Sequence, residues 1–420
     1  MQRFLWALSP NRTRRSKQTR MTTDPRQRLE DGISHLVDER KIISGIAVSY
    51  GDRTQGEAFC RGNLREVRLE NGAFVPDSAP LMTDSVFDLA SVTKLFTCIA
   101  VLQLMERGKL RLDQTVASVD RRFPHIQNVT IEDLLCFRAQ LQTTARMDAV
   151  PSAEEAEALL FDIRPGAPAT RKYYTDMGSM VLKYIVETVS DTLFWDYLRE
   201  NIVHPLGMTR TFAEVPKELL KQTVDCNYER RIVNGAYWLD TTCPPGTVHD
   251  PKARLLNTAR PAPHGHAGVF ASLDDMTRLA RGLLGGALVS RKTLLEIGVN
   301  RTGGKLPDGT DSQYMGYLCY SKQPDQTFSE VPAYFGSRTI ALNGFTGNHF
   351  SVDPEKNQFM ILLANRIHNR ATTVTGRANP LDKTETILWD DGKTYIVSQN
   401  FVYTKDKYLK NHIGDILAGY

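Results

Sequence analysis

Apolar residues recur along this chain with two spacings, one typical of helices and one typical of strands. Residues 25–41 repeat apolar positions every three or four residues, which predicts an amphipathic helix. Residues 42–50 form a nearly continuous apolar run that ends at a Gly-Asp turn, which predicts a buried strand. A second, shorter strand is predicted around residues 58–61.

A long helical pattern follows a polar loop. It begins near Ser91 and ends at Gly108. From residue 109 to about 264 the chain is mostly helical but irregular, and its clearest helices are predicted at residues 131–137, 153–160 and 177–189. Within it, residues 226–264 are rich in Pro, Gly, Thr and charge, so we interpret them as a long, lid-like loop.

Strand patterns return in the last third of the chain. Three strands are predicted at residues 341–344, 349–352 and 358–364, and a turn between the last two makes them an antiparallel hairpin. A further strand at 394–402 and a closing helix at 405–417 are expected.

These elements predict an α/β (α+β) fold in which helices flank an antiparallel sheet. The α/β part is expected to combine residues 23–108 and 265–420, and a mostly helical insertion is expected at 109–264. At 420 residues the chain is long enough for a large core.

The positive net charge belongs to one end of the chain. Residues 1–20 contain six basic residues and no acidic one, so the remaining 400 residues carry −2 of the net +4. We therefore expect a disordered basic tail at residues 1–22 and no nucleic-acid partner. No apolar run approaches the roughly 20 residues of a membrane span, and no convincing signal peptide is present, which favours a soluble, cytoplasmic protein.

The most informative stretch is Ser91-Val92-Thr93-Lys94, at the start of a predicted helix. Residues three apart share a helical face, so the lysine can reach the serine hydroxyl. Backbone N–H groups at a helix start favour developing negative charge, which suits an acyl-transferring serine nucleophile. An N-cap serine is the alternative on this pattern alone.

About eighty residues later, Tyr174-Thr175-Asp176 precedes another predicted helix. Taken alone, Tyr174 could be a core aromatic residue and Asp176 an N-cap. Together with Ser91 and Lys94, however, these residues resemble the serine β-lactamase and penicillin-binding-protein superfamily, in its class C-like esterase and peptidase branch. There a Ser-x-x-Lys element pairs with a Tyr-x-Asn element, so Asp176 stands where asparagine is usual.

Several further stretches carry the same resemblance in the same order, at residues 87–90, 205–211, 246–250, 265–272, 344–347 and 363–366. The likeness covers roughly residues 25–370. It implies a β-lactamase/transpeptidase-like fold that needs no cofactor.

Two elements depart from the family pattern. The third motif, usually Lys-Thr-Gly or His-Thr-Gly, falls on Leu342-Asn343-Gly344 and so lacks its cation, and residues 134–141 replace a loop of the family. Both elements shape the substrate cleft in relatives. The departures favour a small or apolar acyl ester, or a modified peptide, over a β-lactam.

The resemblance makes Ser91 the nucleophile, with Lys94 and Tyr174 as its activators. Our hypothesis is that Tyr174 is the proximal base and Lys94 a cationic organiser, because a nearby cation lowers the pKa of a tyrosine. Asp176 would stabilise the charged lysine and oppose a tyrosinate.

The oxyanion hole is expected to consist of the backbone N–H groups of Ser91 and, by resemblance, Phe345. Asn343 is a candidate substrate contact, and Gly344 fits a strand edge that a substrate approaches closely.

His249, Asp250 and His266 suggest a metal cluster at first sight, but their spacing lacks a third ligand, so we expect no metal and a role in loop structure. Arg366 is expected to be structural.

The predicted function is a serine hydrolase that cleaves a small-molecule ester or amide through an acyl-serine. An acyltransferase with the same chemistry and a non-catalytic binding protein of the same fold are the alternatives.

Overall fold

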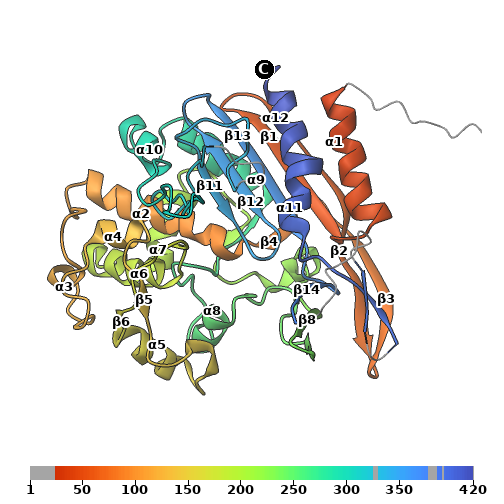
Figure 1. The fold of residues 1–420 in the computed structure, drawn as a ribbon, viewed down its shortest axis with the longest axis horizontal. Helices are drawn as coiled ribbons and strands as arrows, with labels where there is room; N and C mark the ends of the chain where they lie inside the picture. Colours follow the sequence, from red (N-terminus) through yellow and green to blue (C-terminus); the bar gives the residue numbers. More distant parts are fainter. Residues whose placement is uncertain (1–23, 325–329, 377–385, 390–391, 420) are drawn as a thin grey trace, which may run out of the picture.

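The computed structural model of the protein describes residues 24–324, 330–376, 386–389 and 392–419. Its centre is a six-stranded antiparallel sheet with the strand order β11-β12-β13-β1-β2-β3 (Figure 1). The strands are β1 (Gly45–Asp52), β2 (Gly56–Glu70), β3 (Ala73–Pro80), β11 (Ile340–Asn343), β12 (His349–Asp353) and β13 (Gln358–Asn365). Because β1 pairs with β13, both ends of the chain build one sheet, as predicted.

Both faces of this sheet are buried, and β13 shows why its sequence is apolar throughout. Alternate residues of a strand point to opposite faces. Phe359, Ile361 and Leu363 join the core that contains helices α2 (Thr93–Glu106) and α9 (Leu273–Leu284). The residues between them join a second core under α1 (Pro25–Ser34) and α12 (Asn411–Leu417), which lie together on the other face (Figure 1).

The middle of the chain forms a mostly helical region beside the sheet (Figure 1). The predicted helices there are confirmed as α4 (Ile131–Leu135), α5 (Ala153–Phe161) and α6 (Met177–Ser190). The remaining helices are α3 (Val116–Val119), α7 (Phe194–Leu198), α8 (Pro251–Leu256), α10 (Arg291–Ile297) and α11 (Phe401–Lys405). Short strands complete the region and its surroundings: β4 (Val86–Asp88), β5 (Leu141–Gln142), β6 (Arg164–Pro165), β7 (Thr211–Phe212) and β10 (Phe270–Ser272).

The prediction of a long loop at residues 226–264 is wrong. The segment forms the hairpin β8 (Glu229–Val233) and β9 (Ala236–Asp240), followed by α8, and β8 also pairs in parallel with β14 (Ala371–Val374). Its first strand begins Glu-Arg-Arg, so its buried polar residues hid the strand pattern.

Two other boundaries differ from the predictions. The strand expected at 58–61 is the longer β2, whose outer half pairs with the unpredicted β3. The strand expected at 394–402 stops early: β15 (Thr386–Leu388) pairs with β16 (Thr394–Ile396), and the closing helical segment already begins with α11. The predicted basic tail lies outside the described residues. In the part of the chain that is described, no helix has the length and apolar character to cross a membrane.

Candidate active site

Ser91 lies in a single 3₁₀ turn, Ala90–Val92, that joins β4 to α2. Ala90 has a φ of 47°, a left-handed conformation that is costly for a residue with a side chain. Its N–H donates to Asp88 Oδ1 at 2.8 Å, which helps to hold the turn. The described side chains supply no cap at the start of this turn or of α2, so the N-cap alternative for Ser91 is wrong.

Lys94 lies one helical turn after Ser91 and is fully buried. Its ammonium Nζ lies 3.2 Å from Ser91 Oγ, 2.7 Å from the Tyr174 hydroxyl and 2.8 Å from Asp176 Oδ1. Hydrogen bonds that involve an ionised group are the stronger kind, so this lysine fixes the relative positions of the other three side chains. The structure therefore brings together the four residues of the two predicted motifs.

The ring of Tyr174 is stacked between two other aromatic rings. Its centroid lies 5.4 Å from that of Phe137 and 5.7 Å from that of Tyr320. Phe137 belongs to the segment 134–141 that departs from the family pattern, so this segment supports the tyrosine. Burial and then the carboxylate of Asp176 raise the pKa of Tyr174, although a hydrogen bond with Ser91 opposes this. The expectation that this pKa is lowered is therefore wrong.

Asp176 occupies the N-cap position of α6, but its side chain does not cap the helix. It faces two ammonium groups instead, because Oδ2 accepts a hydrogen bond from Lys252 Nζ at 3.0 Å while Oδ1 faces Lys94. Although burial opposes ionisation, Lys94, His266 and Lys252 hold the pKa of this carboxyl well below its usual range. The carboxylate is thus a fixed negative charge near Ser91.

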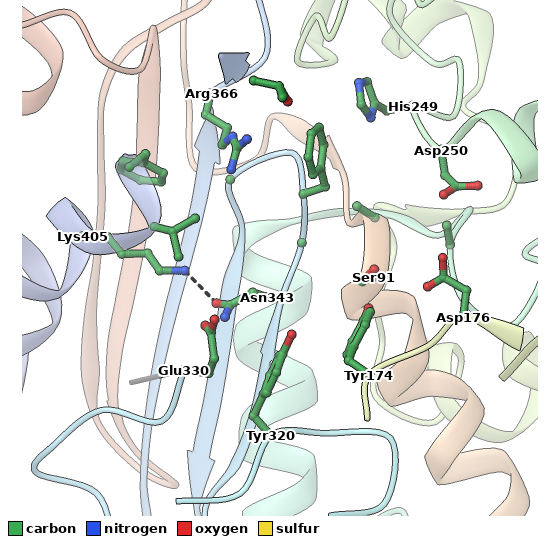
Figure 2. Close-up of a pocket in the computed structure, with 18 of the residues that line it drawn as sticks. Ser91, Tyr174, Asp176, His249, Asp250, Tyr320, Glu330, Asn343, Arg366 and Lys405 are labelled. Carbon is green, nitrogen blue, oxygen red and sulfur yellow. Dashed lines mark hydrogen bonds between the residues drawn. The ribbon is translucent and has the colours of Figure 1, made fainter. Parts of the chain in front are cut away.

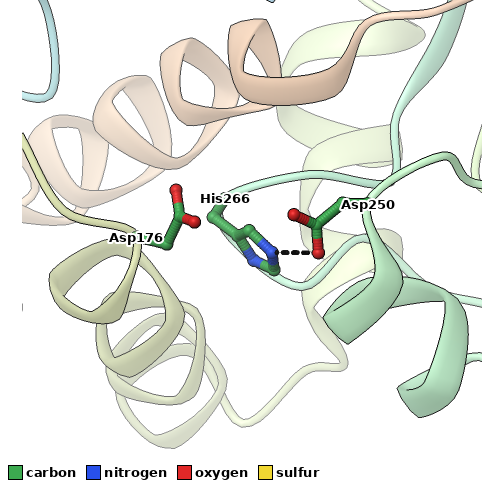
Figure 3. A group of neighbouring side chains, drawn as sticks. All are labelled: Asp176, Asp250 and His266. Carbon is green, nitrogen blue, oxygen red and sulfur yellow. Dashed lines mark hydrogen bonds and ion pairs between the residues drawn. The ribbon is translucent and has the colours of Figure 1, made fainter. Parts of the chain in front are cut away.

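Asp250 and His266 extend this network behind Asp176 (Figure 3). His266 Nε2 lies 2.9 Å from Asp250 Oδ1, and Asp250 Oδ2 accepts from Lys252 Nζ at 3.2 Å. One possible ligand atom from each of Asp176, Asp250 and His266 lies within 4.8 Å of the others, as in a metal site. Here, however, Lys94 and Lys252 already supply positive charge to these carboxylates.

The turn after β11 lies across the pocket from Tyr174 and is hydrogen-bonded to the segment that precedes Ser91. Gly344 N–H donates to the Asn348 carbonyl at 2.9 Å, and the side chains of Thr346 and Asn348 both donate to the carbonyl of Asp88. A Cβ on Gly344 would lie 2.6 Å from the carbonyl oxygen of Leu89, so only glycine fits there. These contacts fix the backbone of Phe345 relative to that of Ser91.

These side chains line one pocket of about 460 Å³, a size suited to a small-molecule ligand (Figure 2). Ser91, Tyr174 and Asp176 line it together with Asn343, Gly344 and Phe345. Every residue predicted for the site except Lys94 therefore lines this pocket. Lys94 is buried, and its ammonium contacts three of the lining residues, Ser91, Tyr174 and Asp176.

The family model described as Beta-lactamase matches residues 30–381. The chain belongs to the β-lactamase family. The fold is the β-lactamase/transpeptidase fold of serine hydrolases, as predicted.

Bacterial proteins with the provisional name D-alanyl-D-alanine carboxypeptidase are similar to this β-lactamase-family protein. One from Escherichia coli O157:H7 is 24% identical over 362 residues, which is 77% of this chain and 79% of the relative. One from Salmonella typhi is 23% identical over 312 residues, which is 68% of this chain and 71% of the relative.

Solved structures share the fold at low sequence identity. A mutant simvastatin synthase (LovD6) from Aspergillus terreus has a TM-score of 0.65 at 17% identity and covers 95% of this chain and 96% of its own. EstCE1, a hydrolase with promiscuous acyltransferase activity, has a TM-score of 0.63 at 17% identity and covers 94% and 98%. A mutant class C β-lactamase has a TM-score of 0.59 at 14% identity and covers 81% and 92%.

The pocket of this β-lactamase-family protein also contains residues that the sequence analysis missed or placed elsewhere. His249, Asp250 and Arg366, which the sequence analysis assigned to structural roles, also line it. The ring of His249 stacks on Phe345, with 5.4 Å between centroids. Tyr320, Glu330 and Lys405 line the pocket as well, and no motif in the sequence pointed to them.

Proposed function

We propose that this β-lactamase-family protein cleaves a small-molecule ester or amide through a covalent acyl-enzyme on Ser91. The observation that carries the proposal is the position of the Lys94 ammonium, which contacts both the Ser91 hydroxyl and the Tyr174 hydroxyl beneath an open pocket. A serine hydroxyl becomes nucleophilic when a neighbouring group can take its proton, and Tyr174, held in place by Lys94, is the candidate for that group.

In the first step, Ser91 Oγ forms a bond to the substrate carbonyl carbon and its proton passes to the oxygen of Tyr174, which enters the step deprotonated beside the Lys94 ammonium. The Lys94–Tyr174 pair then returns the proton to the leaving alcohol or amine as the substrate bond breaks. Water then attacks the acyl carbonyl carbon and gives a proton to the same pair. The bond to Ser91 Oγ breaks as that oxygen takes the proton back, and the acid is released. Within the pair we assign proton transfer to Tyr174 and the role of cationic organiser to Lys94, which is ion-paired with Asp176 at 2.8 Å.

The oxyanion of the tetrahedral intermediate would accept hydrogen bonds from the backbone N–H groups of Ser91 and Phe345. In other enzymes the loss of one such donor costs about 2.7–4 kcal/mol of transition-state stabilisation. Backbone donors do not depend on side-chain identity, so Leu342 in the third motif is compatible with catalysis. Asp176 and Gly344 support the site by fixing Lys94 and the Phe345 turn.

Labelling with a fluorophosphonate probe, followed by intact mass measurement, tests this function. One adduct is expected on the wild type and on Ser118→Ala, which changes an exposed serine of α3. None is expected on Ser91→Ala, and labelling should be slow on Lys94→Ala. If the folded wild type takes no adduct, the protein is a non-catalytic binding protein of this fold.

Acyl transfer to an alcohol is the second candidate. Two structures that cover nearly the whole chain are named as a synthase and as a hydrolase with promiscuous acyltransferase activity. A second hollow adjoins the site and shares Arg231, His249 and Pro251 with it, so an acceptor could lie beside the acyl group. This candidate predicts that added alcohol speeds the turnover of the acyl-enzyme and yields a new ester, whereas hydrolysis alone predicts neither.

A further inference from the structure

Two buried cations line the wall of the pocket that bears the third motif. The Lys405 side chain reaches it from α11, 3% exposed, and the Arg366 side chain reaches it from the end of β13, 6% exposed. In Figure 2 they lie on the opposite side from Tyr174 and Asp176, with Asn343 between. The family places a cation at the position of Leu342, but here that leucine belongs to the core. Lys405, from the C-terminal helical segment, thus places a cation on this wall from a different element of the fold.

Lys405 is aimed at the third motif. Its Nζ donates a hydrogen bond to Asn343 Oδ1 at 2.8 Å (Figure 2). An ammonium group can only donate, so the atom of Asn343 that faces it must be the oxygen. His349 Nδ1 lies 2.7 Å from the same oxygen. The amide nitrogen of Asn343 is therefore a donor that neither Lys405 nor His349 contacts.

Donors on this wall exceed their acceptors. Among the described residues, neither Arg366 Nε nor Asn343 Nδ2 has a hydrogen-bond partner, although both atoms are buried. Two protons of the Lys405 ammonium remain beyond the bond to Asn343. Buried donors of this kind are costly unless a ligand satisfies them.

The charges around the pocket leave this wall positive. Asp176 and Asp250 are compensated by Lys94 and Lys252, and Arg231 pairs with Glu229 at 2.8 Å. Glu330 is the remaining acid on the lining, against Lys405 and Arg366. A single negative charge would balance the wall. Burial lowers the pKa of Lys405 to about 7, which agrees with a cation whose counter-charge is incomplete.

We infer that Lys405 is a specificity-determining residue that, with Arg366 and Asn343, binds a carboxylate of the substrate. This replaces our expectation of an apolar acyl group, and it rests on the proposed acyl-serine function. A carboxylate accepts several hydrogen bonds at once and matches these three donors.

Two pairs of esters test the inference. One pair places the charge on the acyl side, as mono-p-nitrophenyl adipate against p-nitrophenyl hexanoate. The other places it on the leaving side, as p-carboxyphenyl acetate against p-(methoxycarbonyl)phenyl acetate. The wild type should have a higher kcat/KM for the charged ester than for its neutral partner in one of the two pairs. Lys405→Met should lower kcat/KM for that charged ester about 10- to 100-fold, the range of a charged hydrogen bond, and leave its neutral partner within about threefold.

A matched control separates recognition from helix stability. Lys410 is a buried lysine of the same helical segment, it is ion-paired with Asp406 at 2.8 Å, and it does not line the pocket. Lys410→Met should keep the wild-type preference, and Lys405→Arg should keep part of it. No preference in the wild type, or an equal loss for both esters in Lys405→Met, would overturn the inference.

A binding measurement keeps this result distinct from failure of the proposed function. On Ser91→Ala, calorimetry should show tighter binding of adipic acid monoanilide than of hexanoic acid anilide, and Lys405→Met should abolish the difference. If Ser91 takes no fluorophosphonate but this difference is found, the hydrolase proposal fails and the carboxylate site stands. If Ser91 is labelled but the difference in binding is absent, the hydrolase proposal stands and the carboxylate site fails.

Discussion

The carboxylate of Asp176 accepts a hydrogen bond from the ammonium of Lys94, with 2.8 Å between Oδ1 and Nζ. Asparagine is usual at this position in the family pattern described above, so Asp176 adds a negative charge there. Together with burial, this carboxylate raises the pKa of Tyr174. It therefore opposes the loss of a proton from the Tyr174 hydroxyl.

Asp176→Asn should therefore shift the pH dependence of Ser91 acylation to lower pH. Lys252→Met should shift it to higher pH, because this variant removes the cation that offsets Asp176 at 3.0 Å. The measurement is the rate of fluorophosphonate labelling as a function of pH, and Lys221→Met, at an exposed position, is the control. Shifts of both variants in the same direction would contradict this electrostatic account.

Gly344→Ala should slow acylation by about 100-fold or more, because the new Cβ would lie 2.6 Å from the Leu89 carbonyl and force the Phe345 turn away from Ser91. Gly304→Ala is the matched control, since no atom lies within 4 Å of its Cβ. Labelling rate and thermal unfolding are measured together. Equal rates for the two folded variants would show that the turn does not position the oxyanion hole.

Phe345→Ala should label within about threefold of the wild-type rate, because it keeps the backbone N–H that we assign to the oxyanion hole. Phe345→Pro removes that N–H and should label about 100- to 1,000-fold more slowly. The phenyl ring, 41% exposed, contacts His249 and the Arg366 guanidinium, so the alanine variant should instead alter substrate preference. An equal fall in labelling rate for the two variants would contradict the assignment of the Phe345 N–H to the oxyanion hole.

Lys405→Met should remove a pH-dependent part of the stability. Burial and Lys410 lower the pKa of Lys405 to about 7, although Glu330 and Asp406 oppose this and Arg366 adds to it. Between pH 7 and the ordinary lysine pKa near 10.4, the unfolded chain binds the proton that the folded chain has lost. Wild-type unfolding free energy should therefore rise with pH in this window by up to about 1.4 kcal/mol per pH unit relative to Lys405→Met. The measurement is denaturant unfolding of both proteins at pH 7 and pH 10. The same difference in unfolding free energy between wild type and Lys405→Met at the two pH values would contradict the prediction.

The local parts of the site could be predicted from the sequence. The separation of Ser91 and Lys94 by three residues puts them on one helical face wherever that helix lies, and Tyr174 and Asp176 precede a strongly apolar helix. The sheet strands at 340–365 were predictable for the same reason, because alternation along a strand is a local property. Where polar residues are buried, as in β8, the same reasoning failed.

The sequence by itself determined the Ser91–Lys94 pair, the Tyr174–Asp176 element and the core strands, since each depends on spacings of a few residues. Only the tertiary structure decided what surrounds them. Lys405 meets Asn343 across 62 residues of chain, and Lys252 meets Asp176 across 76, because the sheet and the helical region bring distant segments to one pocket. Such pairings follow from the path of the whole chain, so no local pattern of apolar and polar positions contains them.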